Sequence, residues 1–246
     1  LRNVGEDGES LISGLLPYGQ DGEASIAKDS YSSAWWLGIG GEVTLYDPLR
    51  LALDFAYGKA DWGKGTDGQD LTRQGWLVSG LAEYKLDYMT PGLIAWYGSG
   101  DDSNVMDGSE RMPVVSANGN NQFSNFAFNG NPYIAREGVL GTTMVGTWGV
   151  GVRLKDVSFL EDLKHTLRVN FMGGTNAPKM AKYVRDYGNP YEKRGVEDVA
   201  QYGTAYDPLY LTTEDYALEI GLTNTYKMYD NFTVMLDAAY LALWLG

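Results

Sequence analysis

The sequence predicts an all-β protein: a transmembrane antiparallel up-and-down β-barrel to which this chain contributes about eight strands. Three observations predict it. The strand-like segments are long, apolar and polar residues alternate along them, and short connections alternate with long ones. Most segments reach ten or more residues, whereas strands of soluble sheets most often have about five or six. A tilted strand needs about 9–11 residues to cross a bilayer, so residues 1–246 are expected to form a single β-barrel domain.

Eight segments carry the strand pattern. In order along the chain they are Ser33–Tyr46, Leu49–Ala60, Arg73–Tyr88, Gly92–Gly98, Thr143–Lys155, His165–Gly174, Asp215–Met228 and Phe232–Leu245. Each begins or ends near Gly, Pro, Asn or Asp, which are the residues that interrupt strands.

Alternation distinguishes the two faces of these segments. In the second segment Leu51, Leu53 and Phe55 share one face, while Arg50 and Asp54 share the other. The first, third, fifth, sixth and seventh segments repeat this pattern. The fourth, "GLIAWYG", is apolar on both faces and fixes no orientation, and the eighth is less regular because two leucines, at 241 and 243, interrupt its polar face. We expect the apolar faces to contact lipid and the polar faces to line a water-filled lumen.

The connections differ in length at the two ends of the strands. Those at 47–48, 88–91, 156–163 and 228–231 are short, and between them lie long loops at about 61–72, 99–142 and 175–214. Compact soluble domains rarely carry such long loops, whereas outer-membrane barrels have short periplasmic turns and long outer loops. On this rule the first strand runs toward the periplasm and the eighth runs outward.

Composition agrees with this fold and excludes other classes. The chain has 32 Gly, 18 Tyr, 7 Trp and no Cys, so disulfide scaffolds, thiol nucleophiles and thiolate metal sites are excluded. The formal net charge of −13 argues against nucleic acid as a partner. Aromatic residues gather near the segment ends, as in the interfacial belts of membrane proteins.

The polar face supplies the candidate functional residues. The residues expected to line the pore are Arg50, Asp54, Arg73, Glu83, Lys85, Arg153, Lys155, Arg168, Glu219 and Asp237. Mixed charge on a lumenal face keeps water in a pore and lets small ions and polar solutes pass. The loop at 99–142 is long enough to fold into the lumen and form a constriction, or to cover the mouth instead. The residues expected near the constriction are Glu110, Arg111, Asn120, Asn121 and Arg136.

No catalytic motif accompanies these residues. His165 is the only histidine, and no serine or acidic motif supports a catalytic pair with it, so the chain is not expected to be an enzyme. No cofactor is expected. The stretch "DDSNVMDGSE" at 101–110 departs from the spacing of a calcium loop and predicts at most adventitious binding of a divalent cation.

Several segments resemble the outer-membrane homotrimeric porins of sulfate-reducing bacteria. They are "YSSAWWLGIGGEVTLYDPLRLALDFAYG", "RQGWLVSGLAEYKLDYMTPGLIAWYGSGDD", "NFMGGTNAP" and "LTTEDYALEIGLTNTYKMYDNFTVMLDAAYLALWL". The resemblance implies a general diffusion porin of three side-by-side barrels in a Gram-negative outer membrane, in contact with lipid and lipopolysaccharide. Members of that family are longer, so this chain is expected to be part of a barrel of about 16 strands. Two alternatives remain: a small eight-stranded anchoring or adhesion barrel, and a soluble carbohydrate-binding β-protein.

Overall fold

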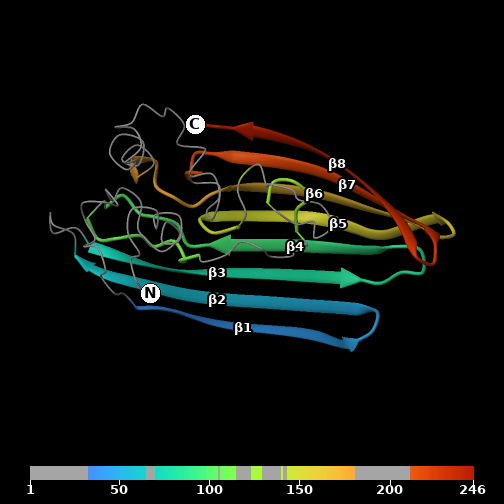
Figure 1. Cartoon of the computed structure of the whole chain (residues 1–246), viewed down its shortest axis with the longest axis horizontal. Coiled ribbons are helices and arrows are strands. Elements are labelled where there is room, and N and C mark those ends of the chain that lie inside the picture. The colour runs from blue at the N-terminus through green and yellow to red at the C-terminus, as the bar shows by residue number, and fades with distance from the viewer. Residues whose placement is uncertain are drawn as a thin grey trace.

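Eight strands form one antiparallel sheet in the computed structural model, which describes residues 33–64, 70–104, 106–114, 123–128, 140, 143–180 and 211–246. The strands are β1 (Ser33–Tyr46), β2 (Leu49–Lys64), β3 (Asp70–Tyr84), β4 (Thr90–Gly98), β5 (Thr147–Leu160), β6 (Leu163–Gly174), β7 (Tyr216–Tyr229) and β8 (Phe232–Trp244). They lie side by side in chain order, with β1 and β8 at the two edges (Figure 1). The predicted all-β, up-and-down antiparallel arrangement is confirmed. Among the described residues, β1 pairs only with β2 and β8 only with β7.

The register carries the alternation of each strand across the whole sheet. One row of directly opposed residues is Leu51, Ala82, Leu93, Val152, Val169, Ile220 and Tyr240. The neighbouring row is Arg50, Glu83, Gly92, Arg153, Arg168, Gly221 and Ala239. Side chains of adjacent rows point to opposite faces, and a slip of one residue would exchange those faces. The apolar and polar residues are therefore sorted onto different sides of the sheet.

The two longest connections lie at the same end of the strands (Figure 1). At one end, residues 47–48, 85–89, 161–162 and 230–231 join consecutive strands. At the other end lie the two longest connections, 99–146 and 175–215, and the connection 65–69, which is as short as 85–89. The positions of these two longest connections agree with the prediction, whereas the long loop expected at 61–72 is replaced by a connection of 65–69.

Several strand boundaries differ from the predicted ones, and the largest differences fall in β2, β3 and β5. The loop at 61–72 is mostly strand, because β2 continues past a register shift at Gly63, whose φ of 81° is one that glycine tolerates. β5 does not end at Lys155, because Asp156 adopts a φ of 56° at a bulge and the strand resumes to Leu160. β3 ends at Tyr84, so Lys85 belongs to a connection and not to the sheet.

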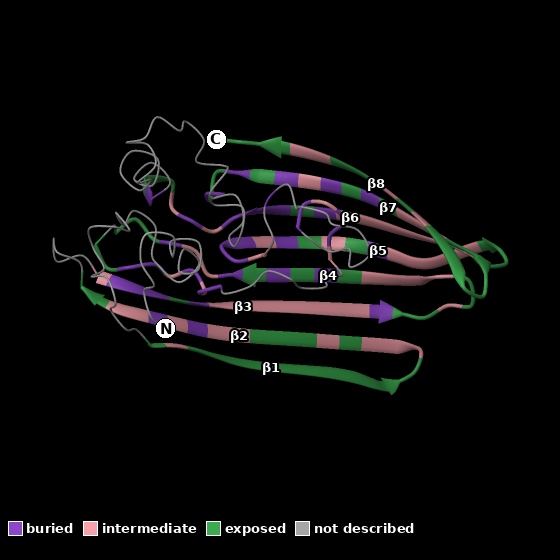
Figure 2. Cartoon of the chain, viewed as in Figure 1, coloured by how far each residue is buried: buried purple, intermediate pink, exposed green. Residues whose placement is uncertain are grey.

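The two faces of the sheet have opposite character. We call the face that carries Leu51, Phe55 and Ile220 the bare face, because these side chains are 40%, 37% and 41% exposed. We call the other face, on which Arg153 is 2% exposed and Glu219 0% exposed, the covered face, because the connection between β4 and β5 packs against it. Figure 2 shows β1 exposed along most of its length and buried residues concentrated in the interior strands. The apolar side chains are thus the exposed ones, and several charged side chains are the buried ones.

Candidate functional site

Aromatic rings form a row on the bare face near the ends that carry the long connections. Neighbouring rings approach within 5.3–6.4 Å between centroids in the pairs Trp35–Tyr57, Phe55–Trp76, Trp76–Tyr97, Trp148–Phe171 and Phe171–Tyr216. In each pair the two rings belong to neighbouring strands, so the row runs across the sheet. Aromatic residues with an apolar body and a polar tip suit a boundary between water and an apolar phase.

A second set of aromatic residues lies near the short connections. Its members, all exposed, are Tyr46, Tyr84, Tyr88, Phe159, Tyr226, Tyr229 and Phe232. Ten residues separate Tyr216 from Tyr226 along β7. At about 3.3 Å per residue and a strand tilt of about 40°, this separation spans about 25 Å, the height of the apolar band of an outer-membrane barrel.

A chain of ion pairs crosses the covered face near the short connections. Arg50 Nε lies 2.8 Å from Glu42 Oε1, and its Nη1 lies 2.7 Å from Glu83 Oε2. The other oxygen of Glu83 lies 2.7 Å from Arg153 Nη2. The Glu83 and Arg153 side chains are 4% and 3% exposed, whereas that of Arg50 is 37% exposed. Paired arginines and acids can share a confined site because each compensates the desolvation of the other.

Residues 109–114 first lie beside β3, beyond the end of β4, and then cross the covered face of the sheet. Ser109 forms a parallel bridge with Arg73 of β3, and the Arg73 guanidinium donates to the carbonyls of Arg111 and Met112, at 3.3 and 3.0 Å. Trp36 of β1 donates from Nε1 to the Pro113 carbonyl at 2.9 Å. The segment therefore runs from β3 toward β1 across the sheet.

Glu110 and Arg111 lie within this segment. Burial raises the pKa of the Glu110 carboxyl, and the nearby acids Asp101, Asp102 and Asp107 add to the effect. Arg111 is fully buried, and its Nη2 lies 3.5 Å from the Val145 carbonyl. Both residues are thus packed against the long-connection ends of the strands.

Residues 123–128 lie against the covered face of β6, β7 and β8. Glu219 Oε1 accepts hydrogen bonds from the backbone N–H groups of Asn125, Phe126 and Ala127, at 2.9, 2.6 and 3.0 Å. It also accepts from the Ser124 hydroxyl at 3.1 Å. Successive N–H groups that converge on one point form an anion-binding nest. Here the carboxylate of Glu219, on β7, occupies the nest.

The Asn125 side chain fixes the same segment to three strands. Its Oδ1 accepts from Arg168 Nη1 at 2.9 Å, and its Nδ2 donates to Thr223 Oγ1 at 2.9 Å and to Asp237 Oδ1 at 3.4 Å. The amide thus contacts β6, β7 and β8 together.

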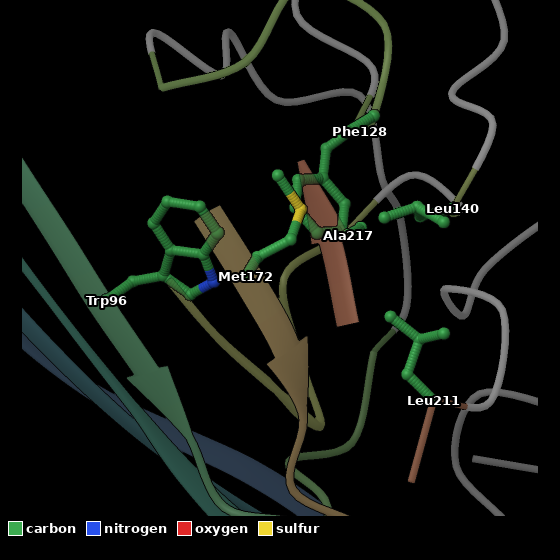
Figure 3. Packing of buried hydrophobic residues seen from close by; sticks show 7 residues of the cluster. Trp96, Phe128, Leu140, Met172, Leu211 and Ala217 are labelled. Atoms are coloured by element: carbon green, nitrogen blue, oxygen red, sulfur yellow. The ribbon is translucent and has the colours of Figure 1, made fainter. Parts of the chain in front are cut away.

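An apolar cluster fills the space between this connection and the sheet. Its buried members are Trp96, Ala127, Phe128, Leu140, Met172, Leu211 and Ala217, with Phe123, Met144 and Leu241 packed against them. Figure 3 shows Phe128 and Leu140 from the connection facing Met172 and Ala217 of the sheet. Trp96, on the strand whose orientation the sequence left open, points to the covered face. Leu241 interrupts the polar pattern of β8. It is apolar because it packs against this cluster beneath the connection.

Glycines on the covered face allow these close contacts. A Cβ at Gly149 would lie 2.2 Å from a ring carbon of Trp96, and one at Gly221 would lie 2.4 Å from Asn125 Oδ1. Larger residues at these two positions would push the ring or the loop away from the wall.

The predicted pore-lining residues fall into three groups. Arg50, Asp54, Lys155, Arg168 and Asp237 lie on the covered face and keep some or most of their exposure. Arg73, Glu83, Arg153 and Glu219 lie on the same face but are buried beneath or beside other residues, which the sequence did not predict. Lys85 lies in the exposed connection after β3.

Some constriction residues lie outside the described part of the chain, and some contacts were missed. Asn120, Asn121 and Arg136 fall outside the described residues. Ser124 and Asn125 were not singled out, and neither was Asn170, whose Nδ2 donates to Glu219 Oε2 at 3.2 Å. An available signal was the phenylalanine-rich stretch 123–128, which is too apolar for a fully solvated loop.

The described residues carry few other features of a chemical site. His165 Nδ1 lies 2.6 Å from Asn224 Oδ1. Within the described ranges, no group of three or more His, Asp or Glu side chains is arranged to hold a metal ion. No helix in that part of the chain is long and apolar enough to cross a membrane.

Comparisons with protein-family models, with curated proteins and with solved structures returned no match.

Proposed function

We propose that this chain forms part of the wall of an outer-membrane porin through which small hydrophilic solutes and ions diffuse passively. One observation carries the proposal: the sheet exposes its apolar residues and covers its charged ones. In a soluble antiparallel sheet the apolar face packs on a core and the polar face meets water. An exposed apolar face that crosses eight strands is stable only against another apolar phase. A bilayer supplies that phase, and the two aromatic sets match its boundaries.

The open edges of the sheet support a barrel larger than this chain. In hydrocarbon, each unpaired backbone group costs several kcal/mol, so β1 and β8 need partners, either each other or further strands. Eight strands alone enclose a space that side chains fill, whereas about 16 leave an aqueous channel. We therefore propose a barrel of about 16 strands, and three barrels side by side as the family resemblance implies.

The covered face suits a water-filled lumen of mixed charge. Both signs occur among the residues of this face that keep some exposure: Arg50, Lys155 and Arg168 are positive, and Glu42 and Asp54 are negative. Such a lining favours general diffusion over strict selection. The connection between β4 and β5 occupies part of this face, which supports its proposed role in narrowing the lumen.

Planar-bilayer recording of the full-length protein, purified in detergent, tests the proposal. A trimeric porin gives ohmic conductance that closes in three equal steps. An anchoring barrel folds into the same bilayers without conductance, and a soluble carbohydrate-binding protein stays in solution without detergent. Either of these two results would overturn the porin proposal.

A further inference from the structure

Glu219 is unusual among the charged residues of the covered face because a single side chain gathers five hydrogen bonds. Four reach Oε1 from residues 124–127, and the fifth reaches Oε2 from Asn170. The side chain is fully buried. Four of the five donors belong to the long connection, and only one belongs to the sheet.

This arrangement holds the connection more firmly than neutral contacts could. Hydrogen bonds to a charged group contribute about 1.5–3 kcal/mol, roughly twice the value between neutral groups. Three consecutive backbone N–H groups share one acceptor, so the loss of this acceptor removes three hydrogen bonds between the connection and the sheet at once.

The neighbouring contacts depend on the same placement. Asn125 reaches Arg168, Thr223 and Asp237 only while its backbone lies on Glu219. Phe128 enters the apolar cluster four residues after Ser124, whose hydroxyl also accepts from the Phe128 N–H at 3.0 Å. The carboxylate thus lies at the centre of the contact between this segment and the wall.

We propose that Glu219 is the positioning residue that holds residues 123–128 on the lumenal wall and thereby sets the open width of the pore. The inference rests on the proposed porin function for its effect on conductance, but its structural part stands alone. Glu219→Gln is the direct perturbation. The variant keeps the side-chain volume and removes the charge, and its amide nitrogen must face either the loop N–H groups or the Asn170 amide.

The first test measures the position of residues 123–128 relative to the sheet and does not depend on channel activity. The chain contains no cysteine, so a pair introduced by Asn125→Cys and Gly221→Cys reports on this contact alone. A Cβ built at Gly221 lies 3.0 Å from Asn125 Cβ, and a small withdrawal of the loop reaches the Cβ separation of about 3.5–4.5 Å that a disulfide needs. The matched control pairs Asn125→Cys with Gly80→Cys, which lies on the bare face.

We expect rapid disulfide formation in the Asn125/Gly221 pair, none in the control, and a large loss of rate when Glu219→Gln is added. Equal rates with and without Glu219 would overturn the proposal, even if the protein proved not to be a channel.

The second test measures the pore. Glu219→Gln is expected to raise single-channel conductance and current noise, whereas Glu161→Gln, in the exposed turn between β5 and β6, leaves both unchanged. In the Glu219→Gln background, oxidation of the cysteine pair to a disulfide should lower single-channel conductance and current noise to the wild-type values. Reduction of the disulfide should raise both again. If Glu219→Gln leaves the conductance unchanged, or if formation of the 125–221 disulfide has no effect on it, Glu219 does not set the pore width. Absence of conductance in the wild type refutes the porin function and leaves the disulfide result to decide the positioning role.

Discussion

Ile220 lies near the middle of β7 on the bare face, four residues from Tyr216 and six from Tyr226. Its side chain is 41% exposed and opposes Val169 and Tyr240 on the neighbouring strands. The substitution Ile220→Arg places a charge where the aromatic sets put the centre of the apolar band. Its cost therefore depends on whether this face meets lipid or water.

The two environments predict different free energies. An arginine at the midplane of a barrel's lipid face costs about 2–4 kcal/mol, and the cost falls to about 0–1 kcal/mol near the interfaces. A substitution at a comparably exposed site in water changes stability by about 0.5 kcal/mol or less. Tyr226 is 42% exposed on the same strand, so Tyr226→Arg is a control that introduces the same residue at matched exposure but at a different depth.

Reversible unfolding in urea, with the protein folded into lipid vesicles and followed by tryptophan fluorescence, measures both variants. We expect Ile220→Arg to lower the free energy of unfolding by about 2–4 kcal/mol, and Tyr226→Arg to lower it by about 1 kcal/mol or less. Equal, small effects at both positions would refute the assignment of the bare face to lipid. A small effect at Ile220 alone would refute the placement of the midplane.

Three further predictions concern the covered face. Arg153→Ala leaves the buried Glu83 carboxylate without one of its arginines and should cost about 3–5 kcal/mol in the same urea assay; a loss below about 1 kcal/mol would contradict the burial of the pair. Gly149→Ala should cost about 1–3 kcal/mol because its methyl group meets the facing indole, while Gly41→Ala, which meets nothing within 4 Å, should stay within about 0.5 kcal/mol. Because the folded-state pKa of Glu110 is raised above its unfolded value, the native state loses stability as the pH rises from about 4 through that folded-state pKa. Glu110→Gln removes this loss, so its stability relative to wild type should increase between about pH 4 and pH 7, and a pH-independent difference would contradict the shift.

The strands were predictable because their signal is local. A period of two in hydrophobicity follows directly from the alternation of side chains along a strand, and β1, β7 and β8 agree with their predicted ranges to within one residue at nearly every end. Boundaries failed where the backbone departs from regular geometry. Gly63 and Asp156 look like turn residues in sequence, yet each lies within a continuing strand at a register shift.

The sequence predicted which side of the sheet carries the candidate site residues, but it did not predict which residues they contact. The placement of Arg50, Arg153 and Glu219 on one side of the sheet followed from parity along each strand. The burial of Arg153 and Glu219 did not, because it depends on pairings between residues 70 or more positions apart. A carboxylate that accepts from three consecutive backbone N–H groups leaves no pattern in the order of side chains.

The sequence by itself determined which residues share a face, which ends of the strands carry the long connections, and that the apolar face is continuous. These properties depend on the two-residue repeat and on turn residues, which act between near neighbours. Only the tertiary structure decided which face the connection between β4 and β5 covers, and which charges it removes from solvent. Those outcomes depend on the fit of a loop onto the sheet, made possible where glycines such as Gly149 and Gly221 leave room for the approaching chain.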